Sequence, residues 1–509
     1  MRKYSSVFLH VGIQLGIYGI IIFLFSYFRL KPIYFQTVGY TYDQGRDFLK
    51  AAEIVLYKNP TFIGPTTGIA GVYHGAWWYY LLSLSFIIFG GNPISFYYFN
   101  FLVQLLTLII FIIFTRKFFG FLTSAIISLI VACSGHLIFT SIFLGNNVMA
   151  MPAFLMLLIS TMLIFDKKYE HKIKYIPVSI STFFAAGLFL GLVAEFEFAF
   201  GLMLIPAYLF LLAVSTFLKK GLRNVKDDLY FFAGLFIAFG PRILFELKNN
   251  FRQTHVFIEY VMKPHYFTPK PYHAILVDRI ELFKGYFGGL FLSDAMRLTF
   301  TGFLIIFVLY RMYAHQFKLK ASFLYLLGLS FLLFMMSTLY KDTFWNYYYD
   351  GIEYLLLFLG GFLLTFYSAK AVRQIAITKS LLLAILIFFG LSKIVMEFNQ
   401  PIVYDGIRVQ RDIVTDIQSQ VKNQNNYCVK IYTPPVIPYT YDYLFLYNKI
   451  SNTFAAPQQD WQNDTCWYVI EYDENNERKD EWMALNIPKK GKKLQSKMIK
   501  DVSLELWKR

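Results

Sequence analysis

The stretch YTYDQGRDFLKAAEIV, residues 40–55, follows the first long apolar run of the chain and carries two aspartates, an arginine and a lysine within eight positions. At a helical period of about 100° per residue, apolar side chains share one arc and charged ones the opposite arc. We expect a short amphipathic helix that lies on the membrane with its apolar side down. Such charges are also typical of an ordinary solvated helix face, so the rest of the chain must decide what the helix does.

The composition is that of a membrane protein. Of the 509 residues, 57% are hydrophobic and only 16% are charged, too few to cover a soluble protein of this size. Several apolar runs reach the roughly 20 residues that cross a hydrocarbon core about 30 Å thick. The first run lacks a signal-peptide cleavage site, so we interpret it as a retained anchor. The net charge of +16 does not indicate nucleic-acid binding, because lysines and arginines lie mainly in short loops between apolar runs.

Basic loops alternate along the chain with loops that carry no lysine or arginine, and this asymmetry predicts the topology. We expect the N-terminus and the basic loops in the cytoplasm, and the connections near 139–147 and 195–199 on the other side. About eleven crossings of the cell membrane then leave the C-terminus extracytoplasmic. The expected spans are 7–28, 94–115, 121–139, 148–165, 176–194, 198–217, 229–246, 297–314, 321–339, 351–369 and 380–396.

The chain is predicted to divide into a transmembrane domain, residues 1–396, and a soluble extracytoplasmic α/β domain, residues 397–509. Two long extracytoplasmic loops interrupt the first domain, at 29–93 and 247–296. The apolar segment 75–91, rich in Trp and Tyr, is interpreted as an interfacial helix, because a crossing there would reverse the side of every later basic loop. In the second domain, Cys428 and Cys466 each begin a strand-like run. The sequence leaves open whether they form a disulfide, and neither has a zinc-ligand spacing.

The rest of the first loop, GPTTGIAGVYHGAWWYYLL (64–82), adds glycines, His74 and an aromatic segment. Together with the charged helix, it resembles the polyprenyl-phosphate-dependent glycosyltransferases of GT-C architecture, which include protein O-mannosyltransferases and lipid A aminoarabinose transferases. Asp43 and Arg46 match the aspartate and arginine of that family's first loop. Gln44 stands where the family has a second acid, and His74 stands where it has a lysine near the lipid phosphate.

Further stretches resemble the family in the expected order along residues 1–395. They are SIFLGNNVMAMP (141–152), GLVAEFEFAFGLMLIP (191–206), GPRILFELKNNF (240–251) and NYYYDGIEYLLLFLGG (346–361). The resemblance implies transfer of a sugar from a polyprenyl phosphate to an acceptor hydroxyl, with inversion, on the extracytoplasmic side. It implies no metal and no other cofactor. The partners expected are this donor, a lipid, glycan or protein acceptor, and the bilayer.

The resemblance also implies roles for individual residues. Asp43 is the expected catalytic base, with Asp47 on the same helix face as a second candidate. The residues expected to bind the donor phosphate are Arg46, His74, Arg242 and Lys341. The residues expected to bind sugar or acceptor are Glu195, Glu197, Asn146, Asn147 and Glu246. Carboxylates at a membrane boundary are costly, which favours a functional role for them, although ion pairing and headgroup contact remain open as ordinary roles.

Other functions remain open. A transporter or flippase of lipid-linked sugars typically shows internal repeats and helices broken at mid-membrane, and neither is found in the sequence. A polysaccharide polymerase or ligase would use related chemistry with diphosphate-linked donors. A non-catalytic scaffold would use the long loops only to bind partners. The sequence does not reveal which sugar is moved or which acceptor receives it.

Overall fold

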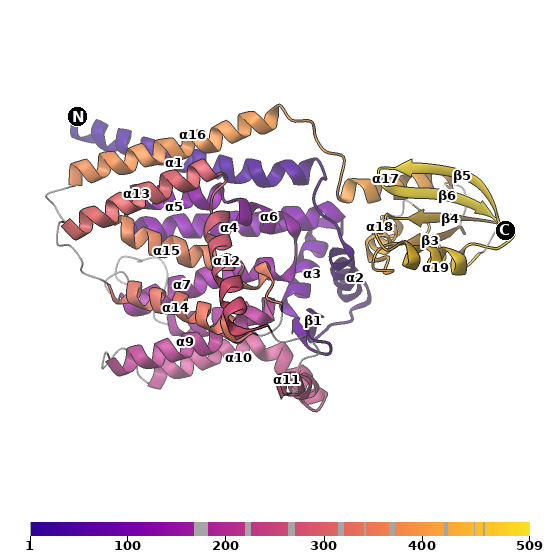
Figure 1. The fold of residues 1–509 in the computed structure, drawn as a ribbon, viewed down its shortest axis with the longest axis horizontal. Helices are drawn as coiled ribbons and strands as arrows, with labels where there is room; N and C mark the ends of the chain where they lie inside the picture. Colours follow the sequence, from indigo (N-terminus) through magenta and orange to yellow (C-terminus); the bar gives the residue numbers. More distant parts are fainter. Residues whose placement is uncertain are drawn as a thin grey trace.

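The computed structural model of the protein describes residues 2–509, except for residues 167–181, 219–224, 263–269, 314–319, 341–342, 366–371, 422–425, 452–453 and 462–463. The described chain is mostly helical. A body of apolar helices carries a smaller domain with a four-stranded sheet at one end (Figure 1).

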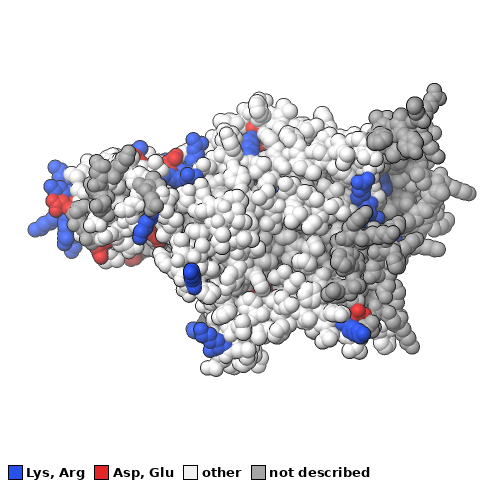
Figure 2. Space-filling model, turned by 180° about the vertical axis from the view of Figure 1, so that it is seen from behind, with Lys and Arg blue, Asp and Glu red and all other residues white. Residues whose placement is uncertain are grey.

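The long helices of the body are α1 (Arg2–Tyr34), α4 (Pro93–Phe119), α7 (Ala150–Phe165, preceded by the 3₁₀ turn η1, Asn146–Met149), α9 (Phe198–Leu218), α10 (Val225–Lys248), α13 (Asp294–Tyr313), α14 (Ala321–Leu339) and α16 (Val372–Phe398). By length and composition, these eight helices of the described residues are able to cross a membrane. Figure 2 shows a broad uncharged band across the body, with charged side chains gathered mainly on the sheet domain. The expected multi-pass α-helical membrane fold is therefore confirmed.

A ninth crossing is made by α5 (Phe121–Ala132) and α6 (Gly135–Phe143), if this pair is counted as one span bent by 52°. Side chains satisfy the backbone groups that the break exposes. The buried guanidinium of Arg29 donates to the carbonyl of Ala132 at 3.0 Å, and Ser134 Oγ accepts from the backbone N–H of Leu137 at 3.2 Å, so both helix ends at the break are satisfied. The two remaining predicted spans, 176–194 and 351–369, correspond to the shorter apolar helices α8 (Thr182–Phe196) and α15 (Ile352–Leu364).

The first long loop folds into α2 (Tyr42–Tyr57), the strands β1 (Ile63–Thr66) and β2 (Tyr73–Gly75), and α3 (Trp77–Phe89). The second contains α11 (Arg252–Met262) and α12 (Tyr272–Gly289). The amphipathic helix α2 is present as predicted, but protein covers its apolar side where lipid was expected. Phe48 is fully buried, and its ring lies 4.0 Å from that of Phe96 and 5.2 Å from that of Tyr443.

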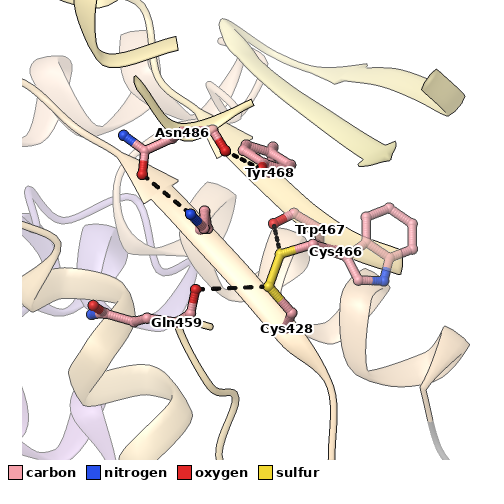
Figure 3. Close-up of a disulfide and its surroundings, with 7 residues drawn as sticks. Cys428, Gln459, Cys466, Trp467, Tyr468 and Asn486 are labelled. Carbon is pink, nitrogen blue, oxygen red and sulfur yellow. Dashed lines mark hydrogen bonds between the residues drawn. A yellow bond between two sulfur atoms is a disulfide. The ribbon is translucent and has the colours of Figure 1, made fainter. Parts of the chain in front are cut away.

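The C-terminal domain consists of α17 (Ile407–Gln420), β3 (Cys428–Tyr432), α18 (Tyr439–Ile450), β4 (Thr465–Ile470), α19 (Asn476–Asn486), β5 (Lys492–Ile499) and β6 (Val502–Lys508). The strand order is β3-β4-β6-β5, with β3 and β4 parallel and the other pairs antiparallel. Cys428 and Cys466 are register partners on β3 and β4, with Cα atoms 4.6 Å apart, and they form the disulfide that the sequence left open (Figure 3).

The C-terminal domain docks on the first loop. Its helix α18 packs against α2, where the Tyr40 hydroxyl donates to the Thr440 carbonyl at 3.2 Å. The Tyr443 hydroxyl donates to the carbonyl of Gly91 at 2.6 Å, beyond the end of α3. The domain therefore packs against the apolar face of α2, while the charged face of α2 points toward the helical body.

Candidate active site

A cavity of about 1010 Å³ lies between the charged face of α2 and the helical body. Its walls come from α2, the β1–β2 loop, α6, η1, the start of α9, α11 and residues within 339–340 and 346–350. Seven of the eleven predicted site residues line it: Asp43, Arg46, Asp47, His74, Asn146, Asn147 and Glu197. Segments more than 300 residues apart in sequence thus line the same polar cavity.

Arg46 is held between two aspartates of its own helix. Its guanidinium lies 2.8 Å from Asp43 Oδ1 and 2.8 Å from Asp47 Oδ1. The other oxygen of Asp47 accepts from the indole N–H of Trp78 at 2.7 Å. The side chain of Asp47 is 3% exposed, whereas that of Asp43 is 42% exposed. Burial raises the pKa of Asp47 to about 6, although Arg46 and Trp78 both stabilise the carboxylate.

Gln44, which replaces the second acid of the family pattern, fixes the N-terminus of α2. Its Oε1 accepts from the backbone N–H of Thr41 at 2.8 Å, which is one half of a capping box. Its Nε2 donates to the carbonyls of Phe143 and Leu144 at 2.8 and 3.0 Å, at the end of α6. Only an amide has both the acceptor and the donors that this position uses. Gln44 therefore ties α2 to α6 across the cavity.

His74 is buried and neutral. Burial, followed by the positive charges of Arg242 and Arg46, lowers the pKa of His74 to about 3. Its Nδ1 accepts from the backbone N–H of Phe198 at 3.3 Å, which leaves the proton on Nε2. The imidazole thus lines the cavity as a neutral hydrogen-bond donor rather than as a cation.

Two of the predicted residues form an ion pair behind the cavity wall. Arg242 Nε donates to Glu195 Oε1, so Arg242 pairs with α8 and not with Glu246 of its own helix. The second carboxylate oxygen of Glu195 and Nη2 of Arg242 are buried without a hydrogen-bond partner. A Cβ at Gly75 would lie 2.0 Å from Glu195 Oε2, so the pair requires glycine beside His74. Neither Glu195 nor Arg242 lines the cavity.

Glu246 and Lys341 have different outcomes. The carboxylate of Glu246 accepts from the backbone N–H groups of Gln253 and Thr254 at 3.2 and 3.1 Å, which caps α11 outside the cavity. Lys341 lies outside the described residues, next to Tyr340, which lines the cavity. The structure therefore places Glu246 in a capping role and leaves Lys341 a prediction.

Glu197 and Asn146 mark the cavity wall between α8 and α9. Asn146 Nδ2 donates to the carbonyl of Phe196 at 2.6 Å. Burial raises the pKa of Glu197 well above its usual value, because only one backbone N–H, that of Ala199, offsets the lost hydration. Burial and then the charges of Glu197 and Asp43 raise the pKa of Tyr347 to about 12, so this phenol lies within electrostatic reach of both acids.

A second polar cluster in the cavity joins the predicted Asn147 to three residues that were not predicted: His136, Asp350 and Glu353. His136 of α6 lies with its Nε2 2.9 Å from Asp350 Oδ1 and 3.4 Å from Glu353 Oε1. The other oxygen of Asp350 accepts from Asn147 Nδ2 at 2.6 Å. His136, Asn147 and Asp350 line the cavity. The signal that could have found this cluster is an isolated ionisable residue in an apolar stretch, the rule that singled out Glu195.

The described residues contain no group of three or more His, Cys, Asp or Glu side chains arranged to hold a metal ion. Among the described residues, the cavity offers an accessible carboxylate at Asp43, a guanidinium at Arg46 and neutral donors such as His74. It also offers buried acids at Glu197 and Asp350. Such a set can accept a proton, stabilise an anion and hydrogen-bond a polyhydroxylated ligand.

No protein-family model matches the sequence, and no curated protein matches it either. The structure is similar to that of ArnT from Cupriavidus metallidurans, which has been solved in the apo state and bound to undecaprenyl phosphate. The apo form is 12% identical, with a TM-score of 0.57, and the bound form is 11% identical, with a TM-score of 0.54. Each match covers 99% of this chain and 98% of the other. The protein therefore has an ArnT-like fold, in agreement with the family resemblance of its sequence.

Proposed function

We propose that the protein is an integral membrane glycosyltransferase. It moves a sugar from a polyprenyl phosphate to an acceptor hydroxyl on the extracytoplasmic side, with inversion at the anomeric carbon. The observation that carries this proposal is the Asp43–Arg46 pair. In a fold shared with ArnT, it faces a cavity of about 1010 Å³. ArnT itself binds undecaprenyl phosphate in one of its structures, which supports a lipid phosphate as the donor here.

Asp43 is the catalytic base in this proposal. Its carboxylate is 42% exposed at the cavity and held at 2.8 Å by Arg46, so it is both reachable and positioned. A base placed in this way contributes roughly 10²- to 10⁴-fold to the rate by accepting the acceptor's hydroxyl proton as the new bond forms. Asp47 has both oxygens occupied by Arg46 and Trp78. We assign it to holding Arg46 in place rather than to proton transfer.

The leaving phosphate needs fixed donors where its charge develops. Arg46 is the guanidinium that lines the cavity among the described residues, and the Nε2–H of His74 adds a neutral donor. Lys341 remains a further candidate because it follows the lining residue Tyr340. Arg242 acts indirectly, because its partner Glu195 packs against Gly75, the residue next to His74.

The remaining polar wall suits the sugar and the acceptor. Asn146 and Glu197 line it, and so do Asn147 and the His136–Asp350 pair. The N-terminus and the C-terminal domain lie at opposite ends of the helical body (Figure 1). This arrangement supports a cytoplasmic N-terminus and an extracytoplasmic cavity and C-terminal domain.

The test compares Asp43→Asn with Glu53→Gln. Glu53 is the matched control because it lies on the same helix, forms an i,i+3 pair with Lys50 at 2.9 Å and is 37% exposed, yet does not line the cavity. Purified protein is given a panel of radiolabelled polyprenyl-phosphate sugars with membrane extract as the source of acceptor, and the released polyprenyl phosphate is measured. We expect Asp43→Asn to lose about 10²- to 10⁴-fold in turnover and Glu53→Gln to keep it.

Two results would contradict the proposal. One is that no donor of a broad panel is turned over. The other is that Asp43→Asn and Glu53→Gln are equally active. A flippase would move the labelled donor between leaflets without releasing polyprenyl phosphate, so the same labelled lipids separate that function from transfer.

A further inference from the structure

The last hairpin of the chain carries an uneven charge. Residues 488–509 contain seven lysines and one arginine against one aspartate and one glutamate. Three of these lysines have acidic partners: Lys493 pairs with Glu505 at 2.7 Å, Lys497 with Asp416 at 2.9 Å and Lys500 with Asp405 at 2.6 Å. The last two partners belong to the start of the domain, so these pairs join the hairpin to its own domain.

The other five cations, here called the terminal basic cluster, form no ion pair with an acid of the described chain. They are Lys489, Lys490, Lys492, Lys508 and Arg509, and all five are exposed. They gather where β5 begins and β6 ends. Lys492 and Lys508 are register partners directly across the antiparallel ladder. Like charges in that position destabilise a strand pair, so the cluster carries an unfavourable energy that a bound anion would remove.

Protection of a sheet edge explains only part of this cluster. Lysines on an edge strand discourage pairing with a strand of another chain, and β5 is an edge strand. That reason covers the lysines within β5. It does not cover Lys489 and Lys490, which precede the strand, or Arg509, which follows β6.

The cluster lies at the tip of the domain, far from the helical body. The C-terminus marks this tip in Figure 1, and Figure 2 shows lysines and arginines gathered at the same end of the domain. Headgroups of the membrane that the body crosses are therefore out of its reach. The five cations are exposed and spread over a turn, two strand ends and a terminus, an arrangement that suits an extended anion better than a single small one. We propose that the terminal basic cluster binds an anionic glycan or polyol chain with repeating phosphate or carboxylate groups.

The test measures binding and includes no catalytic step, so its outcome does not depend on the proposed function. Detergent-purified full-length protein is titrated with fluorescently labelled inorganic polyphosphate and polygalacturonate, as the phosphate and carboxylate probes. Neutral dextran serves as the control polymer. The tip variant carries Lys489→Gln, Lys490→Gln, Lys492→Gln and Lys508→Gln. A control variant with the same loss of charge carries Lys270→Gln, Lys284→Gln, Lys497→Gln and Lys500→Gln, four lysines that already have acidic partners.

We expect the tip variant to bind the anionic probes about tenfold more weakly than the wild type at about 0.1 M salt, because four exposed charges act together. The control variant and a tip variant with arginine at the same four positions should bind as the wild type does. Binding should vanish at about 1 M salt, where the Debye length falls to about 3 Å. Equal weakening of both glutamine variants would overturn the proposal. So would absence of wild-type binding, equal binding of dextran, tighter tip-dependent binding of duplex DNA, or tip-dependent binding to anionic vesicles.

Discussion

Gly45 offers a test in which helix propensity and tertiary packing predict opposite signs. It lies within α2, and a Cβ there would lie 2.5 Å from the backbone nitrogen of Thr440 and 2.6 Å from the carbonyl oxygen of Tyr439. Backbone atoms cannot turn away, so α18 would have to shift by close to an ångström. In a free helix, Gly45→Ala would instead stabilise by about 1 kcal/mol.

The expected effect of Gly45→Ala follows from these two terms. Inserting a methyl group into a well-packed contact costs typically 1–3 kcal/mol, and the two short contacts with backbone place this site at about 3 kcal/mol. Subtracting the gain in propensity of about 1 kcal/mol leaves a net loss of about 2 kcal/mol. A loss of this size should lower the Tm of the affected domain by several degrees. Turnover should fall as well, because α2 carries Asp43 and Arg46.

The assay is thermal unfolding of the purified protein in detergent, followed by tryptophan fluorescence, together with limited proteolysis of the C-terminal domain. Gly39→Ala is the matched control, because no atom lies within 4 Å of a Cβ built at Gly39. If Gly45→Ala raises Tm, or leaves it where Gly39→Ala does, the close packing of α18 on α2 is wrong.

Three other predictions concern the cavity. Gln44→Glu would restore the acid of the family pattern, yet we expect it to destabilise the protein by about 1–3 kcal/mol, because a carboxylate cannot donate to the carbonyl of Phe143. The measurement is Tm. Gln44→Met is the control, because it removes the donors without adding charge. The pKa of Asp47 is about 6 in the folded state and near 3.8 in the unfolded state, so the folded state binds this proton more tightly. The stabilisation of about 3 kcal/mol that this gives at low pH should be lost as pH rises through 6. Tm measured from pH 4 to 8 should show this fall in the wild type and not in Asp47→Asn. Asp350→Asn should lower turnover about tenfold or more and also destabilise the protein by about 1–3 kcal/mol, because an amide cannot accept from both His136 and Asn147 and leaves one buried donor without a partner. An unchanged turnover would exclude the cluster from the site.

The helices of the body could be predicted from sequence because a long apolar run is a local signal. The same is true of α2, whose charge period and N-terminal Thr41–Gln44 pair are both visible in the chain. The break between α5 and α6 could not be predicted. It depends on Arg29, which reaches the end of α5 from another helix more than 100 residues away. The surface that covers Phe48 was missed for a similar reason, since its partner Tyr443 comes from the far end of the chain.

The residues of the candidate site also differ in whether they could be predicted from local sequence. Residues of the first loop were found because they are close in sequence and match a family pattern. His136 and Asp350 are 214 positions apart, and nothing in the chain links the two. Only the fold brings them within 2.9 Å. Glu246 was assigned to the site because it is an acid near a predicted span end, but its carboxylate caps the helix that follows.

The two aspartates of α2 lie one turn apart, and their surroundings separate their roles. The carboxylate of Asp47 is almost fully buried and satisfied by Arg46 and Trp78, so removing a proton from an acceptor would first require it to break one of these bonds. Asp43 shares the same guanidinium but is open to the cavity, and a proton can reach it without such a loss. Asp43→Asn should therefore lower turnover with little change in Tm, whereas Asp47→Asn should alter the pH dependence of Tm and disturb Arg46. The reverse pattern would assign proton transfer to the buried acid and require α2 to open during the reaction.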